Sequence, residues 1–238
     1  WPDDYFSLYQ SLNYSRYNTL NYTSIFTFGG GNGVYNALSY GIALSRNSVD
    51  APIFPRNGSE ITIGLNLTPP YTLFQGDVDY HTMLPSLRYK WVEYYKIKFK
   101  GAWYISLIEK LVMTPRIRFG FLGTYNKDLG VTPFERFYLG GDGLTGTNNM
   151  DGRELIGMRG YANNSLTPGY PATVGGTVYT RYTLEMRYPI SLNPSATIYG
   201  LGFVEAGNDW LLWNSFSPFK VHGSVGFGVR VFLALFGL

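Results

Sequence analysis

The chain has 238 residues, of which 45% are apolar and 18% aromatic, so it is too apolar to be disordered. Its net charge of +3 is too small to indicate a nucleic-acid partner, and the absence of cysteine excludes disulfides and thiolate metal centres. Charged residues make up only 15%, whereas 29 glycines and 21 tyrosines are typical of strands, tight turns and aromatic anchors at a membrane interface.

Eight segments alternate apolar and polar side chains with the period of two that a strand requires. Each is close to the length of a tilted strand that crosses a membrane, whereas no segment reaches the roughly 18 apolar residues of a spanning helix. Any membrane crossing must therefore use strands. In chain order, the expected strands are Phe6–Arg16, Ala37–Arg46, Ser59–Thr68, Tyr94–Leu107, Leu111–Tyr125, Val178–Tyr188, Ala196–Ala206 and Val221–Leu235.

The polar faces of these strands are strongly basic. A soluble β-sandwich also alternates, but it rarely lines one face with so many cations, which need water around them. We therefore favour a membrane barrel with a wet interior over the sandwich. The basic residues expected on the inner wall are Lys96, Lys98, Lys100, Arg116, Arg118, Arg181, Arg187 and Arg230.

Short and long connections alternate along the chain, as in transmembrane antiparallel β-barrels of the bacterial outer membrane. The short ones, expected on the periplasmic side together with Pro2–Tyr5, are Asn47–Gly58, Ile108–Lys110 and Pro189–Pro194. The longest connection, Asn126–Gly176, shows no strand pattern. A loop of this length is usually functional or disordered.

Two segments of the long loop resemble motifs of a known family. The stretch 135–141, which includes Phe137, Tyr138, Gly140 and Gly141, and the stretch 158–161, which is Met158, Arg159, Gly160 and Tyr161, resemble the pre-motif and the Arg-Gly-aromatic motif of the BamA family of outer-membrane insertases. Residues 50–58, 183–186 and 202–210 resemble, in the same order, the family's Phe-Pro turn, its glutamate-bearing strand and its acidic strand end.

The resemblance implies a fragment of one barrel domain, corresponding to strands seven to fourteen of a sixteen-stranded barrel. It implies that the loop 126–177 enters the lumen and that Arg159 contacts Glu185 and Glu205, and it leaves no part of residues 1–238 for periplasmic docking domains. The strand pattern is consistent with this contact, because both glutamates lie on polar strand faces and need a cation once a loop displaces water. An arginine fork can engage carboxylates in bidentate fashion, Gly160 would allow close approach, and Tyr161 would pack beside it. In the family the arginine follows the Gly-Gly pair closely, whereas here residues 142–157 intervene.

By this resemblance, the expected function is that of the core of the barrel assembly machinery, which folds and inserts β-barrel proteins into the outer membrane. The expected partners are outer-membrane lipids, client β-barrel proteins and accessory lipoproteins, with no nucleic acid. The alternatives are a TamA-like or two-partner secretion pore, and a passive porin that favours anions.

No enzyme, cofactor or metal site is expected. The two histidines, His81 and His222, accompany no Gly-x-Ser-x-Gly motif, and neither glycine-rich stretch continues as a phosphate-binding loop. The paired aspartates lack the spacing of a calcium loop.

Overall fold

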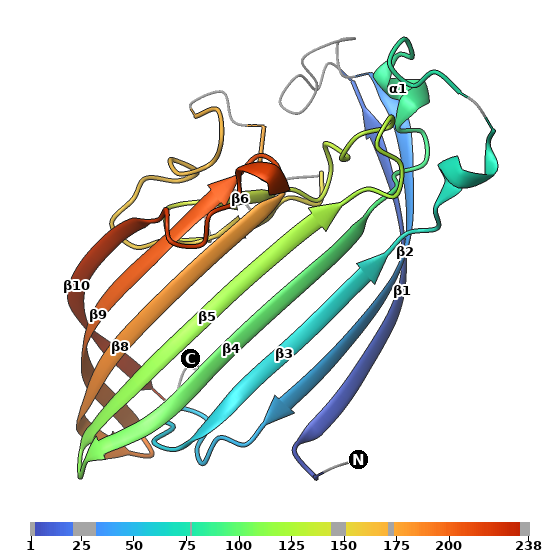
Figure 1. Cartoon of the computed structure of the whole chain (residues 1–238). Helices are drawn as coiled ribbons and strands as arrows, with labels where there is room; N and C mark the ends of the chain where they lie inside the picture. The colour runs from blue at the N-terminus through green and yellow to red at the C-terminus, as the bar shows by residue number, and fades with distance from the viewer. Residues whose placement is uncertain (1–2, 21–31, 77, 144–150, 171–173, 234–238) are drawn as a thin grey trace.

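A computed structural model describes residues 3–20, 32–76, 78–143, 151–170 and 174–233 of the chain. Its main element is an antiparallel sheet of eight strands in the order β1-β2-β3-β4-β5-β8-β9-β10, so each strand pairs with the next strand of the same sheet along the chain (Figure 1). The strands are β1 (Phe6–Thr19), β2 (Gly33–Asn47), β3 (Gly58–Leu67), β4 (Tyr95–Ile108), β5 (Leu111–Gly123), β8 (Val178–Asn193), β9 (Ala196–Trp210) and β10 (His222–Leu233).

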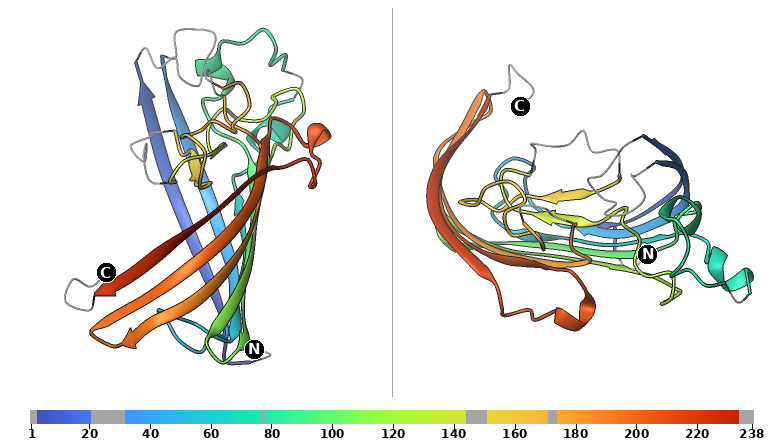
Figure 2. Two further views of the ribbon diagram at one scale, coloured as in Figure 1. Left: turned by 90° about the vertical axis from the view of Figure 1, so that its left-hand side faces the viewer. Right: turned by 90° about the horizontal axis from the view of Figure 1, so that it is seen from above.

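The sheet is strongly curved and has one concave face, as the view from above in Figure 2 shows. The outermost strands β1 and β10 have no strand partner on their outer edges among the described residues. The sheet is therefore an open wall of a barrel, which confirms the predicted all-β class and the prediction of a barrel fragment. The minor elements are η2 (Tyr71–Phe74), α1 (Pro85–Arg88) and η3 (Trp213–Ser215), and no helix in the described ranges is long and apolar enough to cross a membrane.

All eight predicted strands form, but several ends lie elsewhere. The predicted turn Pro189–Pro194 is wrong in extent, because β8 continues to Asn193 and only Pro194 and Ser195 turn the chain. The pairing of β8 with β9 is irregular between Pro189 and Ser191. Proline lacks the N–H that a regular ladder needs, and such an irregularity accommodates it without ending the strand.

The two faces of the wall differ as alternation requires. Apolar side chains on the convex face are exposed, with Ile63 at 51%, Leu184 at 41% and Phe227 at 93%. On the concave face, charged side chains such as Glu185 and Arg187 are almost fully covered. The convex face is the surface that meets lipid, and the concave face lines the lumen.

The long connection is not free of regular structure, which corrects the sequence analysis. It contains the short strands β6 (Phe137–Leu139) and β7 (Glu154–Ile156), which pair in parallel. Both lie on the concave side of the sheet (Figure 2). Phe137 packs on Tyr179 of β8, with ring centroids 4.7 Å apart, and Gly120 of β5 leaves room for both rings.

The turn between β2 and β3 shows why a glycine follows Asn57. Gly58 has a φ of +104°, and a Cβ atom there would lie 2.2 Å from the carbonyl oxygen of Ser48. The Asp50 carboxylate accepts hydrogen bonds from the backbone N–H groups of Arg56 and Asn57, at 2.8 and 3.1 Å. Burial alone would raise the pKa of Asp50, but these bonds outweigh it, and the pKa of Asp50 is lowered.

Candidate functional site

The candidate site is the contact between the long loop and the inner wall. We call the described part of the loop, residues 126–143, 151–170 and 174–177, the plug. Its apolar side chains join a cluster on the concave face that includes residues of β2, β5 and β8, together with Val92 and Tyr94 just before β4. Phe134, Phe137, Leu139 and Met158 are each at most 1% exposed. The plug is thus packed against the wall and does not hang free in the lumen.

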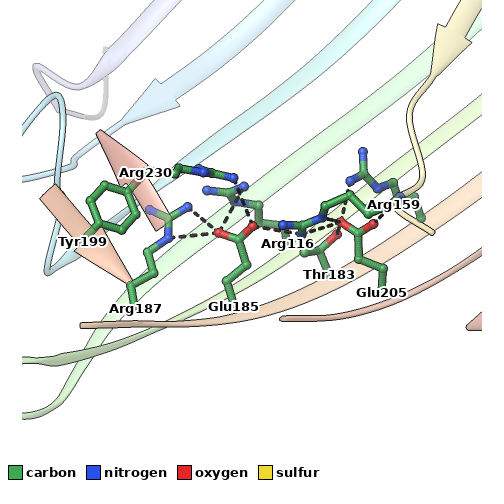
Figure 3. A network of polar contacts seen from close by, with 9 residues as sticks. Arg116, Arg159, Thr183, Glu185, Arg187, Tyr199, Glu205 and Arg230 are labelled. Carbon is green, nitrogen blue, oxygen red and sulfur yellow. Dashed lines mark hydrogen bonds and ion pairs between the residues drawn. The ribbon is translucent and has the colours of Figure 1, made fainter. Parts of the chain in front are cut away.

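Arg159 is the centre of the site (Figure 3). Its Nε and Nη2 atoms donate to Oε1 of Glu205 at 2.9 and 2.6 Å, and its backbone N–H donates to Oε2 of the same carboxylate at 3.0 Å. Nη2 also donates to Oε1 of Glu185 at 2.9 Å. The guanidinium lies over the ring of Phe203, 3.5 Å from its centroid. One side chain of the plug therefore bridges two strands, β8 and β9.

Both carboxylates have further cations on the wall itself. Arg181 donates to Glu205 at 2.5 Å, and Arg187 donates to Glu185 at 2.6 Å. Nη2 of Arg230 and Nη1 of Arg116 lie 3.4 and 3.7 Å from carboxylate oxygens of Glu185. Because both glutamate side chains are 0% exposed, the arginines supply the neutralisation that water cannot. We call these seven side chains the arginine network: Arg116, Arg159, Arg181, Arg187, Arg230, Glu185 and Glu205.

The residues beside Arg159 hold the backbone in place. Gly160 has a φ of +86°, and a Cβ there would lie 3.3 Å from Cβ of Ser224 on β10. The hydroxyl of Tyr161 donates to the carbonyl oxygen of Gly223 at 2.7 Å. The motif thus contacts β10 as well as β8 and β9, and a bulkier residue at 160 would crowd this approach.

The pre-motif and the motif meet directly, despite the residues that separate them in sequence. Met158 N–H donates to the carbonyl of Gly141 at 2.9 Å, and Gly141 N–H donates to the carbonyl of Tyr161 at 3.1 Å. Gly140 has a φ of +127°, and a Cβ there would lie 2.5 Å from the carbonyl oxygen of Ala162. The chain therefore leaves at Gly141 and returns at Met158. The sixteen residues that separate Gly141 from Met158 in sequence therefore do not displace Arg159 from the wall.

A second ionic contact was missed by the sequence analysis. Lys96, on the inner face of β4, donates to the carbonyl oxygen of Glu135 at 2.9 Å and lies 3.3 Å from the carboxylates of both Glu135 and Glu154. Lys98 lies 3.2 Å from Glu154. The available signal was the lysine run on one face of this strand together with the glutamate that opens the pre-motif. Neither revealed which lysine meets which acid.

The environments of the two plug carboxyls differ in their balance of burial and charge. Burial raises the pKa of Glu154, but Lys96 and Lys98 outweigh it, so the pKa of Glu154 is lowered overall. Burial also raises the pKa of Glu135, and there Lys96 does not fully compensate, so the pKa of Glu135 stays raised. Glu135 also has a φ of 64°, which is rare for a residue with a side chain. The lysine contact stabilises a strained position.

Replacing Lys96 by Met should loosen the plug, because the side chain is only 3% exposed and two carboxylates would lose their shared cation. We expect a loss of about 2 to 3 kcal/mol and faster tryptic cleavage within the plug. The matched control is Lys100→Met on the same face of β4, since no described carboxylate lies within 4 Å of Lys100. Equal cleavage rates in the two variants would contradict the assignment.

An antiparallel wall with a lipid-facing outer surface, an ionic inner surface and a plug clamped to that surface defines a transmembrane β-barrel with an occupied lumen. A family model described as the Omp85 superfamily domain matches residues 3–238. The chain belongs to the Omp85 superfamily, and it is located in the bacterial outer membrane.

Among solved structures, the chain is similar to BamA from Haemophilus ducreyi lacking POTRA domains 1-3, with a TM-score of 0.64 and 18% sequence identity. The match covers 95% of this chain and 45% of that chain, so this chain spans less than half of the BamA chain. No curated protein matches the chain. The resemblance to the BamA family is confirmed in superfamily and fold.

Proposed function

We propose that this chain forms part of the barrel wall and the plug of a BamA-like insertase, which folds client β-barrel proteins and inserts them into the outer membrane. The observation that carries the proposal is the clamp of Arg159 on Glu205 and Glu185, since it joins the plug to two wall strands at once. Superfamily membership and the fold shared with BamA support it. The proposed role is mechanical and not enzymatic.

In this proposal the exposed edge that receives client strands lies outside this chain, at the seam of the complete barrel. An unpaired strand edge binds an incoming strand through backbone hydrogen bonds. Opening a seam removes one row of such bonds, and the remaining wall must keep its curvature meanwhile. A plug fixed to β8, β9 and β10 by Arg159 and Tyr161, and to β4 by Lys96, is suited to hold that curvature.

The proposal is tested with full-length protein reconstituted in liposomes, by following the insertion of a client β-barrel. We expect insertion well above that of empty liposomes and a severalfold slower rate for Arg159→Ala, assayed where both proteins are folded. Lys127→Ala is the control, because Lys127 is an exposed cation of the plug and no described carboxylate lies within 4 Å of it. Insertion no faster than in empty liposomes would refute the insertase role, and export of passenger proteins instead would favour a TamA-like or two-partner secretion pore.

Single-channel conductance distinguishes the passive porin. A plug packed on the inner wall should give small and irregular currents, whereas a porin with this basic wall should give steady, anion-selective steps. Steady steps in the unmodified protein would favour the porin.

A further inference from the structure

Three lysines of β4 form a ladder on the inner wall, and the plug binds only the first two of them. Lys96, Lys98 and Lys100 occupy alternate positions and therefore share one face, about 6.8 Å apart per step. Glu135 and Glu154 of the plug bind the first two lysines at 3.2 to 3.3 Å. β4 runs from the plug toward the short turn at Glu109 and Lys110 (Figure 1). Lys100, the third lysine of the ladder, thus lies beyond the plug, toward the end of the barrel that carries the short turns.

The lower part of the ladder carries an excess of positive charge. Lys100 lies directly opposite Arg118 of β5, and Arg118 lies directly opposite Arg181 of β8. Like charges placed opposite each other across strands are destabilising unless an anion lies between them. Arg181 has Glu205, but no described carboxylate lies within 4 Å of Lys100 or Arg118. The stretches outside the described ranges contain a single acidic residue, Asp77.

The neighbouring carboxylates are already engaged. Arg116 lies 3.7 Å from Glu185, which binds Arg187 and Arg159 at 2.6 and 2.9 Å. The arginine network with Lys100, Arg118 and Glu60 contains seven cations and three carboxylates, a balance of 7 − 3 = +4. The carboxylates of the described ranges therefore do not neutralise this part of the inner wall.

This surface is also hollowed. Two adjoining hollows of about 230 and 260 Å³ share Lys100 and Thr62 in their walls, and the larger is also lined by Tyr104, Arg116 and Arg118. The side chains of Lys100 and Arg118 are exposed toward the lumen. A ligand that enters the lumen can reach them.

We propose that Lys100, Arg116 and Arg118 form a binding site for an extended acidic peptide segment that carries carboxylates at alternate positions. The plug already shows this kind of binding, because its glutamates bind Lys98 and Lys96, which lie two and four residues before Lys100 on the same face of β4. Arg116 and Arg118 are likewise two residues apart on β5, so an extended segment with the same repeat can meet both strands. The inference goes beyond the insertase role and does not depend on it.

The test uses full-length protein in detergent micelles and a fluorescein-labelled peptide of four Glu-Thr repeats, with binding measured by fluorescence anisotropy at low salt. The double variant Lys100→Gln/Arg118→Gln should weaken binding about tenfold, and salt should weaken it further. The matched control Lys110→Gln/Lys127→Gln removes two exposed cations elsewhere and should change binding less than about twofold. A peptide with four Gln-Thr repeats should not bind.

Three results would overturn the proposal. They are an affinity in the Lys100→Gln/Arg118→Gln variant equal to that of the control, binding of the Gln-Thr peptide as tight as that of the Glu-Thr peptide, and displacement of the peptide by inorganic phosphate at an equal concentration of charge. The last result would indicate a general oxyanion site. Because neither substitution removes an ion pair of the described chain, both variants should retain the heat-resistant barrel band in gel electrophoresis, which verifies folding.

Discussion

Replacing Arg159 by Ala should destabilise the barrel by about 2 to 4 kcal/mol, which corresponds to a fall of roughly 5 to 10 °C in unfolding temperature for a domain of this size. The substitution removes three side-chain hydrogen bonds to buried carboxylates and the contact with the ring of Phe203. The loss is smaller than for an isolated pair, because Arg181 and Arg187 remain on the same carboxylates. The measurement is the temperature at which the heat-resistant band disappears in gel electrophoresis.

Two comparisons make this result specific. Arg159→Lys keeps the charge but cannot bridge two carboxylates with a planar fork, so it should recover only part of the stability. Arg118→Ala removes an arginine of the same inner wall without breaking an ion pair of the described chain, so it should leave the temperature nearly unchanged. If Arg159→Ala unfolds at the same temperature as Arg118→Ala, the clamp does not stabilise the barrel.

Replacing Glu185 by Gln should have a larger effect, about 3 to 5 kcal/mol, because it removes the charge that four arginines share. Arg187 is the most affected, since its side chain is 2% exposed and both its Nε and Nη2 atoms donate to Glu185. Gln has nearly the same shape, so the loss would reflect charge and not packing. The same electrophoretic assay measures it, and the unfolding temperature should fall by about 10 °C or more.

Two further variants test whether the loss of stability in Glu185→Gln is due to charge. Glu60→Gln changes an exposed carboxylate on the same wall and should alter stability by less than about 0.5 kcal/mol. The double variant Glu185→Gln/Arg187→Met should recover part of the loss, because an apolar side chain replaces the stranded cation. If the double variant is less stable than Glu185→Gln alone, uncompensated charge is not the cause.

The strands of the wall could be predicted from sequence because each has one lipid-facing and one polar face. Alternation identified all eight, but not their ends. Pro189 suggested a turn, and only the pairing of β8 with β9 shows that the strand continues past it. Likewise, β9 continues to Trp210 through Gly207, Asn208 and Asp209, which have low strand propensity but pair with β8.

The plug was harder to predict, because its structure depends on contacts between residues distant in sequence. β6 and β7 are three residues each, too short for a period to be detected, and they exist because they pair with each other on the wall. The arginine contact could be anticipated from the family motif, whereas the lysine contact could not. A row of three lysines leaves the register with Glu135 and Glu154 undetermined until the fold is known.

The two ionic contacts of the plug have opposite polarity, and this arrangement specifies the orientation in which the plug binds the wall. At β8 and β9 the wall contacts the plug through glutamates and the plug supplies an arginine, whereas at β4 the wall supplies lysines and the plug supplies glutamates. A plug inserted the other way round would set Arg159 against lysines and its glutamates against Glu185 and Glu205. Repulsion between like charges would then disfavour the reversed orientation. The charges of the wall thus favour one orientation of the plug over the other.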